Sequence, residues 1–141
     1  MKRKVMLSIR GTQTYADQEP EVIELVTEGY MEYTDGGWNI SYQESELTGL
    51  KGVQTTFRVE PDKVILTRTG ALRSTMEFQI GISHDSLYQL EFGALMITVT
   101  TRHLFYDILP DGGCIDLLYD LEIEKSEGGQ VDYHLDIRTI E

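Results

Sequence analysis

Glu44 and Arg68 are the residues of this 141-residue chain whose type and position point most directly to chemistry. Each continues a run in which apolar residues alternate with others: Glu44 stands two positions after Tyr42, and Arg68 two positions after Leu66. Residues two apart in a β-strand share a face, so both charges are predicted to point toward the interior. A buried charge is costly unless it is paired, neutralised or in contact with solvent in a cavity.

This pair of charges has two interpretations. In the first, Arg68 is a polar anchor inside a pocket, where its guanidinium can bind a carboxylate or phosphate through two hydrogen bonds. In the second, Glu44 and Arg68 lie near strand ends at the wet mouth of a barrel and form an ordinary ion pair. A bulge would reverse either facing assignment, because a shift of one residue turns a side chain to the other face of the sheet.

The signals for a metal site or a catalytic nucleophile are weak. Asp132, His134 and Asp136 share one face of a predicted strand. Ligands from a single strand rarely enclose a metal ion, so we interpret them as a solvated acidic face and predict no metal site. His84 falls in a predicted loop, and neither Cys114 nor any serine stands at a suggestive spacing from a histidine. We expect no cofactor.

The sequence also gives no clear signal for a catalytic pair of acids or for a phosphate-binding loop. Glu44, Glu46 and Glu91 could supply the acid and base of a glycosidase, but no spacing singles out two of them. The glycine-rich segments all read as hairpin turns, and none opens a helix as a phosphate cradle does. The sequence therefore favours a protein that is not an enzyme.

Composition excludes some partners. The chain carries 24 acidic and 12 basic residues, a formal net charge of −12. Such a field repels phosphate backbones and anionic membrane surfaces, so we expect neither nucleic acid nor membrane as a partner. The basic start is followed by a broken apolar run rather than a secretory signal, and Cys114 has no second cysteine with which to form an internal disulfide. Both observations favour the cytoplasm.

Alternation with a period of two dominates the chain and predicts about ten strands. Residues 21–33 also allow a helix, but their β-branched and aromatic content, with Gly29 in the middle, favours a strand. The apolar phase flips between Thr101 and Leu104 without a turn residue, which indicates a bulge or sharp bend. The predicted strands cover residues 4–10, 21–33, 38–46, 53–60, 64–69, 75–80, 87–92, 95–108, 115–124 and 131–138.

So many short strands in one chain need a barrel or a sandwich to bury their apolar faces. Turn residues stand at nearly every junction, and no long crossover connection separates the strands. We therefore predict one all-β domain over residues 1–141. Its fold is expected to be a closed or nearly closed antiparallel up-and-down barrel of about 8–10 strands.

Several short motifs resemble the YwiB-like family of small bacterial proteins of unknown function. They are Tyr42-Gln43-Glu44, residues 48–52, Thr55-Thr56, Arg68-Thr69-Gly70, Met76-Glu77-Phe78, Gly112-Gly113 and Tyr119-Asp120-Leu121. The resemblance extends over nearly the whole chain. It implies a calycin-like barrel, the architecture of lipocalins and fatty-acid-binding proteins, and it implies no activity.

The best-supported function is binding of a small, anionic or amphipathic molecule at the mouth or in the interior of the barrel. The candidate lining residues are Tyr42, Glu44, Thr55, Phe57, Arg68 and Met76. The alternative is a filled barrel that acts as an interaction module through a homodimer or a protein partner. A hydrolase or isomerase working in the pocket is the third possibility.

Inward residue size does not decide between a hollow and a filled barrel. Small or polar inward positions (Thr27, Gly29, Thr55 and Ser74) favour a hollow barrel, and large ones (Trp38, Phe57, Phe78 and Tyr119) favour a filled one.

Overall fold

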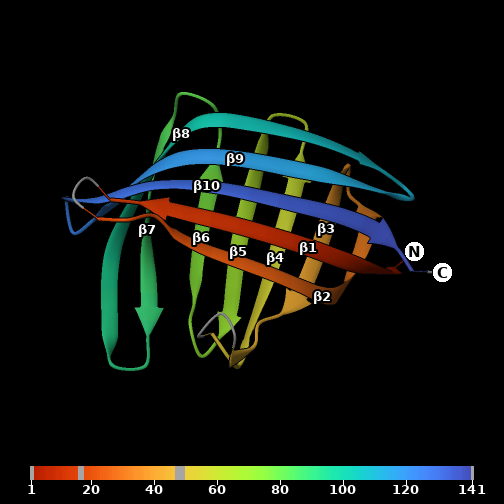
Figure 1. Cartoon of the computed structure of the whole chain (residues 1–141), viewed down its shortest axis with the longest axis horizontal. Coiled ribbons are helices and arrows are strands. Elements are labelled where there is room, and N and C mark those ends of the chain that lie inside the picture. The colour runs from red at the N-terminus through yellow and green to blue at the C-terminus, as the bar shows by residue number, and fades with distance from the viewer. Residues whose placement is uncertain (1, 16–17, 47–49, 141) are drawn as a thin grey trace.

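The part of the chain that the structure describes contains ten strands (Figure 1). A computed structural model describes residues 2–15, 18–46 and 50–140, so part of the predicted loop over residues 47–52 lies outside the described residues. The strands are β1 (Arg3–Thr14), β2 (Glu21–Thr34), β3 (Gly37–Gln43), β4 (Val53–Glu60), β5 (Lys63–Gly70), β6 (Ser74–Phe78), β7 (Ser83–Leu90), β8 (Gly93–Leu109), β9 (Gly112–Ile123) and β10 (Ser126–Thr139).

All ten strands belong to one antiparallel sheet, in the order β6-β5-β4-β3-β2-β1-β10-β9-β8-β7. Every strand except the first and last of the chain pairs only with its sequence neighbours, and β1 pairs with β10. The ambiguous segment 21–33 is strand β2, and the phase flip is a bulge in β8 between Thr101 and His103. The predicted all-β, nearly closed up-and-down barrel is therefore confirmed.

The sheet folds into two crossing layers (Figure 1). Strands β1, β2, β9, β10 and the second half of β8 run along the molecule, and β3 to β6 cross them steeply on the other side. Strand β2 makes one corner, because it pairs with β1 over most of its length and with β3 from Tyr30 onward. Strand β8 makes the other corner near its bulge, as bulges do in orthogonal sheet packings.

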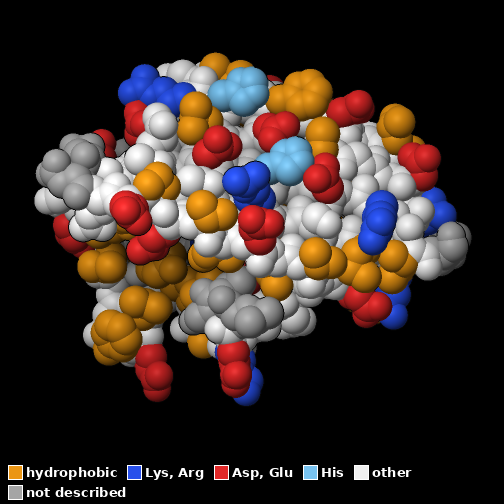
Figure 2. Space-filling model, viewed as in Figure 1, with side chains coloured by type: hydrophobic (Ala, Val, Ile, Leu, Met, Phe, Trp, Pro, Cys, Tyr) orange, Lys and Arg blue, Asp and Glu red, His pale blue; other side chains and the backbone are white. Residues whose placement is uncertain are grey.

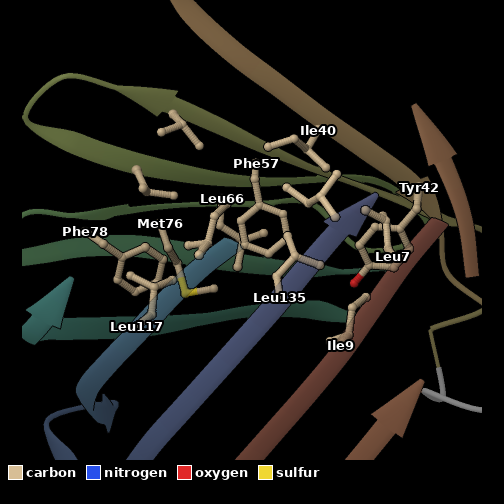
Figure 3. Close-up of a cluster of buried hydrophobic side chains, with 14 of the residues drawn as sticks. Leu7, Ile9, Ile40, Tyr42, Phe57, Leu66, Met76, Phe78, Leu117 and Leu135 are labelled. Atoms are coloured by element: carbon tan, nitrogen blue, oxygen red, sulfur yellow. The ribbon is translucent and has the colours of Figure 1, made fainter. Parts of the chain in front are cut away.

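The core lies between these two layers. Alternate residues of each strand point inward, and several, such as Leu7, Phe57 and Leu135, are completely shielded from solvent. Figure 3 shows side chains of the two layers meeting: Phe57, Leu66 and Leu135 lie together in the centre, and Met76, Phe78 and Leu117 lie to one side. Burial of these apolar side chains is the main force holding the layers together.

The two edge strands, β6 and β7, are joined by few hydrogen bonds. At one end, Arg73 and Gln89 exchange two backbone bonds of 2.9 and 2.8 Å. At the other end, Thr101 beside the β8 bulge accepts from the backbone N–H of Gln79 with its hydroxyl (3.1 Å) and from that of Gly81 with its carbonyl (3.0 Å). Thr101 is buried, and its hydroxyl is satisfied by the hydrogen bond that helps to close the barrel.

His84 spans the middle of this seam. Its Nδ1 accepts a 3.4 Å bond from the backbone N–H of Glu77, and its Nε2 lies 3.2 Å from the Glu77 carboxylate. Lys63 approaches the other oxygen of that carboxylate at 3.1 Å. The prediction that His84 lies in a loop was wrong: it lies in β7, where the exposed, polar edge weakened the alternation signal.

The acidic outer face of β9 and β10 holds a small ion-pair cluster. His134 contacts the Asp116 carboxylate through Nδ1 and the Asp136 carboxylate through Nε2 at 2.9 Å. These hydrogen bonds, the one to Asp116 foremost, raise the pKa of His134. Within the described part of the chain, no group of ligand-type side chains is placed to hold a metal ion.

The seam gives the first testable prediction. Thr101→Val keeps the side-chain volume but leaves the partly buried N–H of Gln79 without its acceptor, which costs about 1–3 kcal/mol. We expect the free energy of unfolding in urea to fall by that amount. Amide hydrogen exchange is expected to accelerate selectively in β6 and β7, relative to β1 and β10. Thr69→Val, at an exposed position of β5, is the matched control. Equal free energies of unfolding for the Thr101 and Thr69 variants would contradict the role of Thr101.

The His134 cluster gives a prediction about pH. Because its folded-state pKa is raised, the protonated ring stabilises the fold, and this contribution is complete below the unfolded pKa of roughly 6.5. The contribution is lost as the pH rises through the folded pKa. His134 is more than a third exposed, so the effect is expected to be at most about 1 kcal/mol. Urea unfolding of the wild type and His134→Gln across pH 5–9, a range chosen to bracket roughly pH 6.5, measures it. Parallel pH profiles for the two proteins would show that the cluster adds no pH-linked stability.

Candidate functional site

One end of the barrel interior is filled and the other is hollow. Apolar side chains close the filled end completely, among them Val5, Ile40, Val64 and Ile115. The hollow end contains a cavity of about 430 Å³, within the range of small-molecule sites. The sequence left open whether the barrel is hollow or filled, and the structure shows a barrel that is filled at one end and hollow at the other.

The cavity wall is mainly apolar and aromatic. It is lined by Ile9, Gly11, Thr12, Gln13, Tyr15, Glu21, Ile23, Leu25, Tyr42, Glu44, Leu50, Phe57, Leu66, Arg68, Met76, Phe78, Tyr88, Leu95, Ile97, Leu117, Tyr119, Leu121, Ile123, Val131 and Tyr133. Its inner wall is formed by shielded residues such as Phe57, Phe78 and Leu117. Ile23 (48% exposed) and Leu95 (39% exposed) are exposed members of the lining, so they lie where the cavity opens to solvent. Figure 2 shows apolar side chains gathered on this side of the molecule, near the β7–β8 hairpin.

Arg68 is the one cation among the described residues of the lining. It is partly buried on β5, between its paired neighbours Thr55 on β4 and Ser74 on β6. Its Nε is buried and has no hydrogen-bond partner among the described residues. Buried donors are nearly always satisfied, so an unsatisfied guanidinium nitrogen facing a cavity is an exception that calls for an explanation.

Three tyrosines line the cavity together with Arg68. Burial raises the pKa of Tyr42 and of Tyr119 to about 12, and it raises the pKa of Tyr133 well above its ordinary value. The positive charge of Arg68 acts in the opposite direction on the pKa of all three tyrosines. The phenols therefore stay protonated at neutral pH and can donate hydrogen bonds. Tyr42 and Tyr133 lie 3.4 Å apart, hydroxyl to hydroxyl.

Gly29 lets Tyr42 reach this position. Strand β3 crosses β2 so closely here that a side chain on Gly29 would meet the Ser41 carbonyl oxygen at 2.4 Å and the Leu7 side chain at 2.8 Å. Only glycine permits such an approach, which packs Tyr42 against the wall of the barrel.

Glu44 bonds to a hydroxyl of the neighbouring strand. Its carboxylate accepts a 2.5 Å hydrogen bond from Thr55, and both residues are buried. Glu44 and Arg68 both line the cavity, and the ion pairs described for this part of the chain do not include a contact between the two. Sequence alternation places both residues on the inner face but cannot show which neighbouring side chain each one meets.

The predicted lining residues do come together. Tyr42, Glu44, Phe57, Arg68 and Met76 all line the cavity, and Thr55 supports it through its bond to Glu44. Sequence reasoning missed Tyr119 and Tyr133, which bring two phenols to the cavity from β9 and β10. Their only signal was a place on the apolar face of two regular strands, which looks the same for a core residue.

Among the residues that the structure describes, no helix is long and apolar enough to cross a membrane.

Comparison with known proteins places the chain among uncharacterised barrels. It is 29% identical over 141 residues to the uncharacterised beta-barrel protein YwiB of Bacillus subtilis (strain 168), covering 99% of this chain and 94% of the relative. The fold is also similar to the crystal structure of the ywiB protein from Bacillus subtilis, with a TM-score of 0.89, 24% identity and the same coverage of both chains. At that identity, the structural likeness concerns the fold.

A sequence model of a domain of unknown function, DUF1934, matches residues 7–137, which is nearly the whole chain. The resemblance noted from the sequence motifs is confirmed. The chain belongs to the DUF1934 family.

Proposed function

We propose that the hollow end of the barrel binds a small amphipathic anion, with Arg68 as its polar anchor. The observation that carries the proposal is the buried Arg68 Nε without a hydrogen-bond partner among the described residues, in the wall of a cavity of about 430 Å³. A guanidinium offers a planar pair of donors that matches an oxyanion, and a bound anion would satisfy the group that the protein leaves unsatisfied.

The rest of the cavity indicates that the same ligand also has an apolar part. Phe57, Leu66 and Phe78 present apolar surface on the inner wall, and burial of such surface is the general source of affinity in small-molecule sites. The exposed rim at Ile23 and Leu95 gives a route of entry.

Two fluorescent probes test the proposal. N-phenyl-1-naphthylamine is neutral, and 1-anilinonaphthalene-8-sulfonate is the same molecule carrying one sulfonate. We expect the wild type to bind both. Arg68→Met is expected to weaken sulfonate binding about tenfold or more, in line with the loss of a hydrogen-bonded charge pair, and to leave binding of the neutral probe within about twofold.

Arg102→Met is the matched control, because it removes one positive charge from an exposed outer position paired with Asp120. It should leave the affinity for both probes unchanged. Equal sulfonate affinity in the Arg68 and Arg102 variants would rule out Arg68 as the anchor. Failure of the wild type to bind the neutral probe would rule out the cavity as a binding site.

Self-association is a second candidate function, supported by apolar side chains on the β7–β8 hairpin. Phe92 at the hairpin tip is 88% exposed, and Leu87 and Leu95 on its two strands are also exposed. Exposed apolar groups of this kind are common at contacts between proteins.

Light scattering after size exclusion tests this second candidate. If the hairpin joins two copies, the wild type elutes as a dimer and Phe92→Ser as a monomer. Leu109→Ser, at an exposed site on another hairpin, leaves the dimer intact. A monomeric wild type at high protein concentration would exclude the candidate.

A further inference from the structure

We propose that the free edge of β2 is a docking site for an extended segment of another protein, which adds to the sheet as a further strand and carries basic and apolar residues. The free edge is the side of residues 21–29 that faces away from β1. This inference concerns the strand edge itself and does not depend on the ligand proposed for the cavity.

The first support is the lack of a second partner strand. Strand β2 pairs with β1 from Glu21 to Met31, but with β3 only from Tyr30 to Thr34. Beyond this point β3 follows β4 instead, as far as Gln43. None of the backbone hydrogen bonds found among the described residues reaches residues 21–29 on this side. An unpaired strand edge is a template for pairing with an additional strand.

The turn between β2 and β3 shows which backbone groups lie on the free edge. Asp35 and Gly36 form a two-residue turn with positive φ angles of 51° and 80°, so the flanking residues Thr34 and Gly37 exchange backbone hydrogen bonds. The bonding direction alternates along a strand, so the N–H and C=O groups of every second residue of β2 point the same way as those of Thr34. On the free edge these residues are Val22, Glu24, Val26 and Glu28.

The second support is the open space beside this edge. Ile23 and Leu25 of β2 line the cavity of about 430 Å³. A second hollow, a groove of about 350 Å³, lies where β3 diverges from β2, and Gly29 of β2 and Gln43 of β3 are among its lining residues. A strand that followed the free edge would run along both hollows.

The side chains at the free edge indicate the sequence of the partner. Val22 (49% exposed) and Val26 (65% exposed) alternate with the exposed residues Glu24 and Glu28. Side chains of an added strand lie directly opposite them, where opposite charges stabilise the pairing and like charges destabilise it. We therefore expect apolar residues opposite the two valines and basic residues opposite the two glutamates.

Glu24 contributes most to the preference for a basic partner. Glu28 lies 3.7 Å from Lys4, whereas Glu24 takes part in none of the ion pairs of the described residues, although Arg10 is opposite it on β1. A second copy of the chain would bring the same glutamates and a net charge of −12, which disfavours self-pairing along this edge.

A fluorescently labelled peptide that matches the edge tests the docking site. Acetyl-Lys-Thr-Val-Thr-Lys-Thr-Val amide can pair antiparallel with β2 and place its lysines opposite Glu28 and Glu24. We expect fluorescence anisotropy to show saturable binding to the wild type. Replacing both lysines by glutamate is expected to weaken binding about tenfold or more. Methylation of both valine nitrogens, which removes donors that face β2, is expected to have an effect of similar size.

Reversing one charge on the protein tests the role of Glu24. Glu24→Lys is expected to weaken binding of the lysine peptide about threefold to tenfold and to strengthen binding of the glutamate peptide. Asp132→Lys is the matched control, because it makes the same charge change at an exposed position of β10 that is paired on both sides. It should leave both affinities within about twofold of the wild type, since exposed charges that lie far apart are screened by salt.

Amide hydrogen exchange measured by NMR locates the bound peptide. Binding should slow exchange at the N–H groups of Val22, Glu24 and Val26, and should leave unchanged those of Ile23 and Leu25, which already face β1. Protection elsewhere, or no binding of the lysine peptide, would overturn the docking site.

Three further outcomes would also contradict the proposal. Equal affinity for the methylated and unmethylated peptides would show general charge attraction instead of strand addition. Equal affinity for the lysine and glutamate peptides would overturn the basic partner. A concentration-dependent dimer in which the same β2 amides are protected without peptide would make a second copy of the chain the occupant.

Discussion

A ten-stranded antiparallel sheet has two edges, and the architecture of this protein depends on how they are joined. β6 and β7 meet through one backbone bridge, Arg73 to Gln89, and through the contacts of His84 with Glu77, while Thr101 of β8 binds the segment that connects the two strands. Thr101 stands beside the bulge at which β8 turns from one layer toward the other. The same irregularity therefore makes a corner of the barrel and supplies the acceptors that close it. Without this closure, the inner faces of β5 and β6, which carry Arg68 and Met76, would not face β9 and β10.

The layers cross, so they do not fill the interior evenly. Where they lie close, residues such as Val5 and Ile115 pack without space between them, and where they diverge a cavity remains. Most of that cavity is apolar, yet its wall carries Arg68, whose buried Nε has no hydrogen-bond partner among the described residues. An unsatisfied buried donor reduces stability, and a bound oxyanion would recover that loss. These local features support both the position and the charge of the proposed ligand.

Much of the fold could be predicted from the sequence because every strand repeats the same local rule. Alternation identified β2 in spite of its helix-like glutamates, and the phase flip after Thr101 located the β8 bulge. It also placed Glu44 and Arg68 on the inner face. Alternation could not show that Glu44 would meet Thr55, because partners across strands depend on register and side-chain rotamer. Nor could it single out Tyr119 and Tyr133 as lining the same cavity as Arg68, since residues from distant strands come together only once the barrel closes.

The central claim is that Arg68 holds an anionic head group while the apolar part of the ligand occupies the hollow end of the barrel. A crystal structure of the protein with decanoate tests it most directly. The account predicts the carboxylate within hydrogen-bond distance of the Arg68 guanidinium and the alkyl chain against Phe57, Phe78 and Leu117. A decanoate found in the reverse orientation, with its carboxylate in solvent at the rim near Ile23 and Leu95, or bound outside the cavity, would contradict the account.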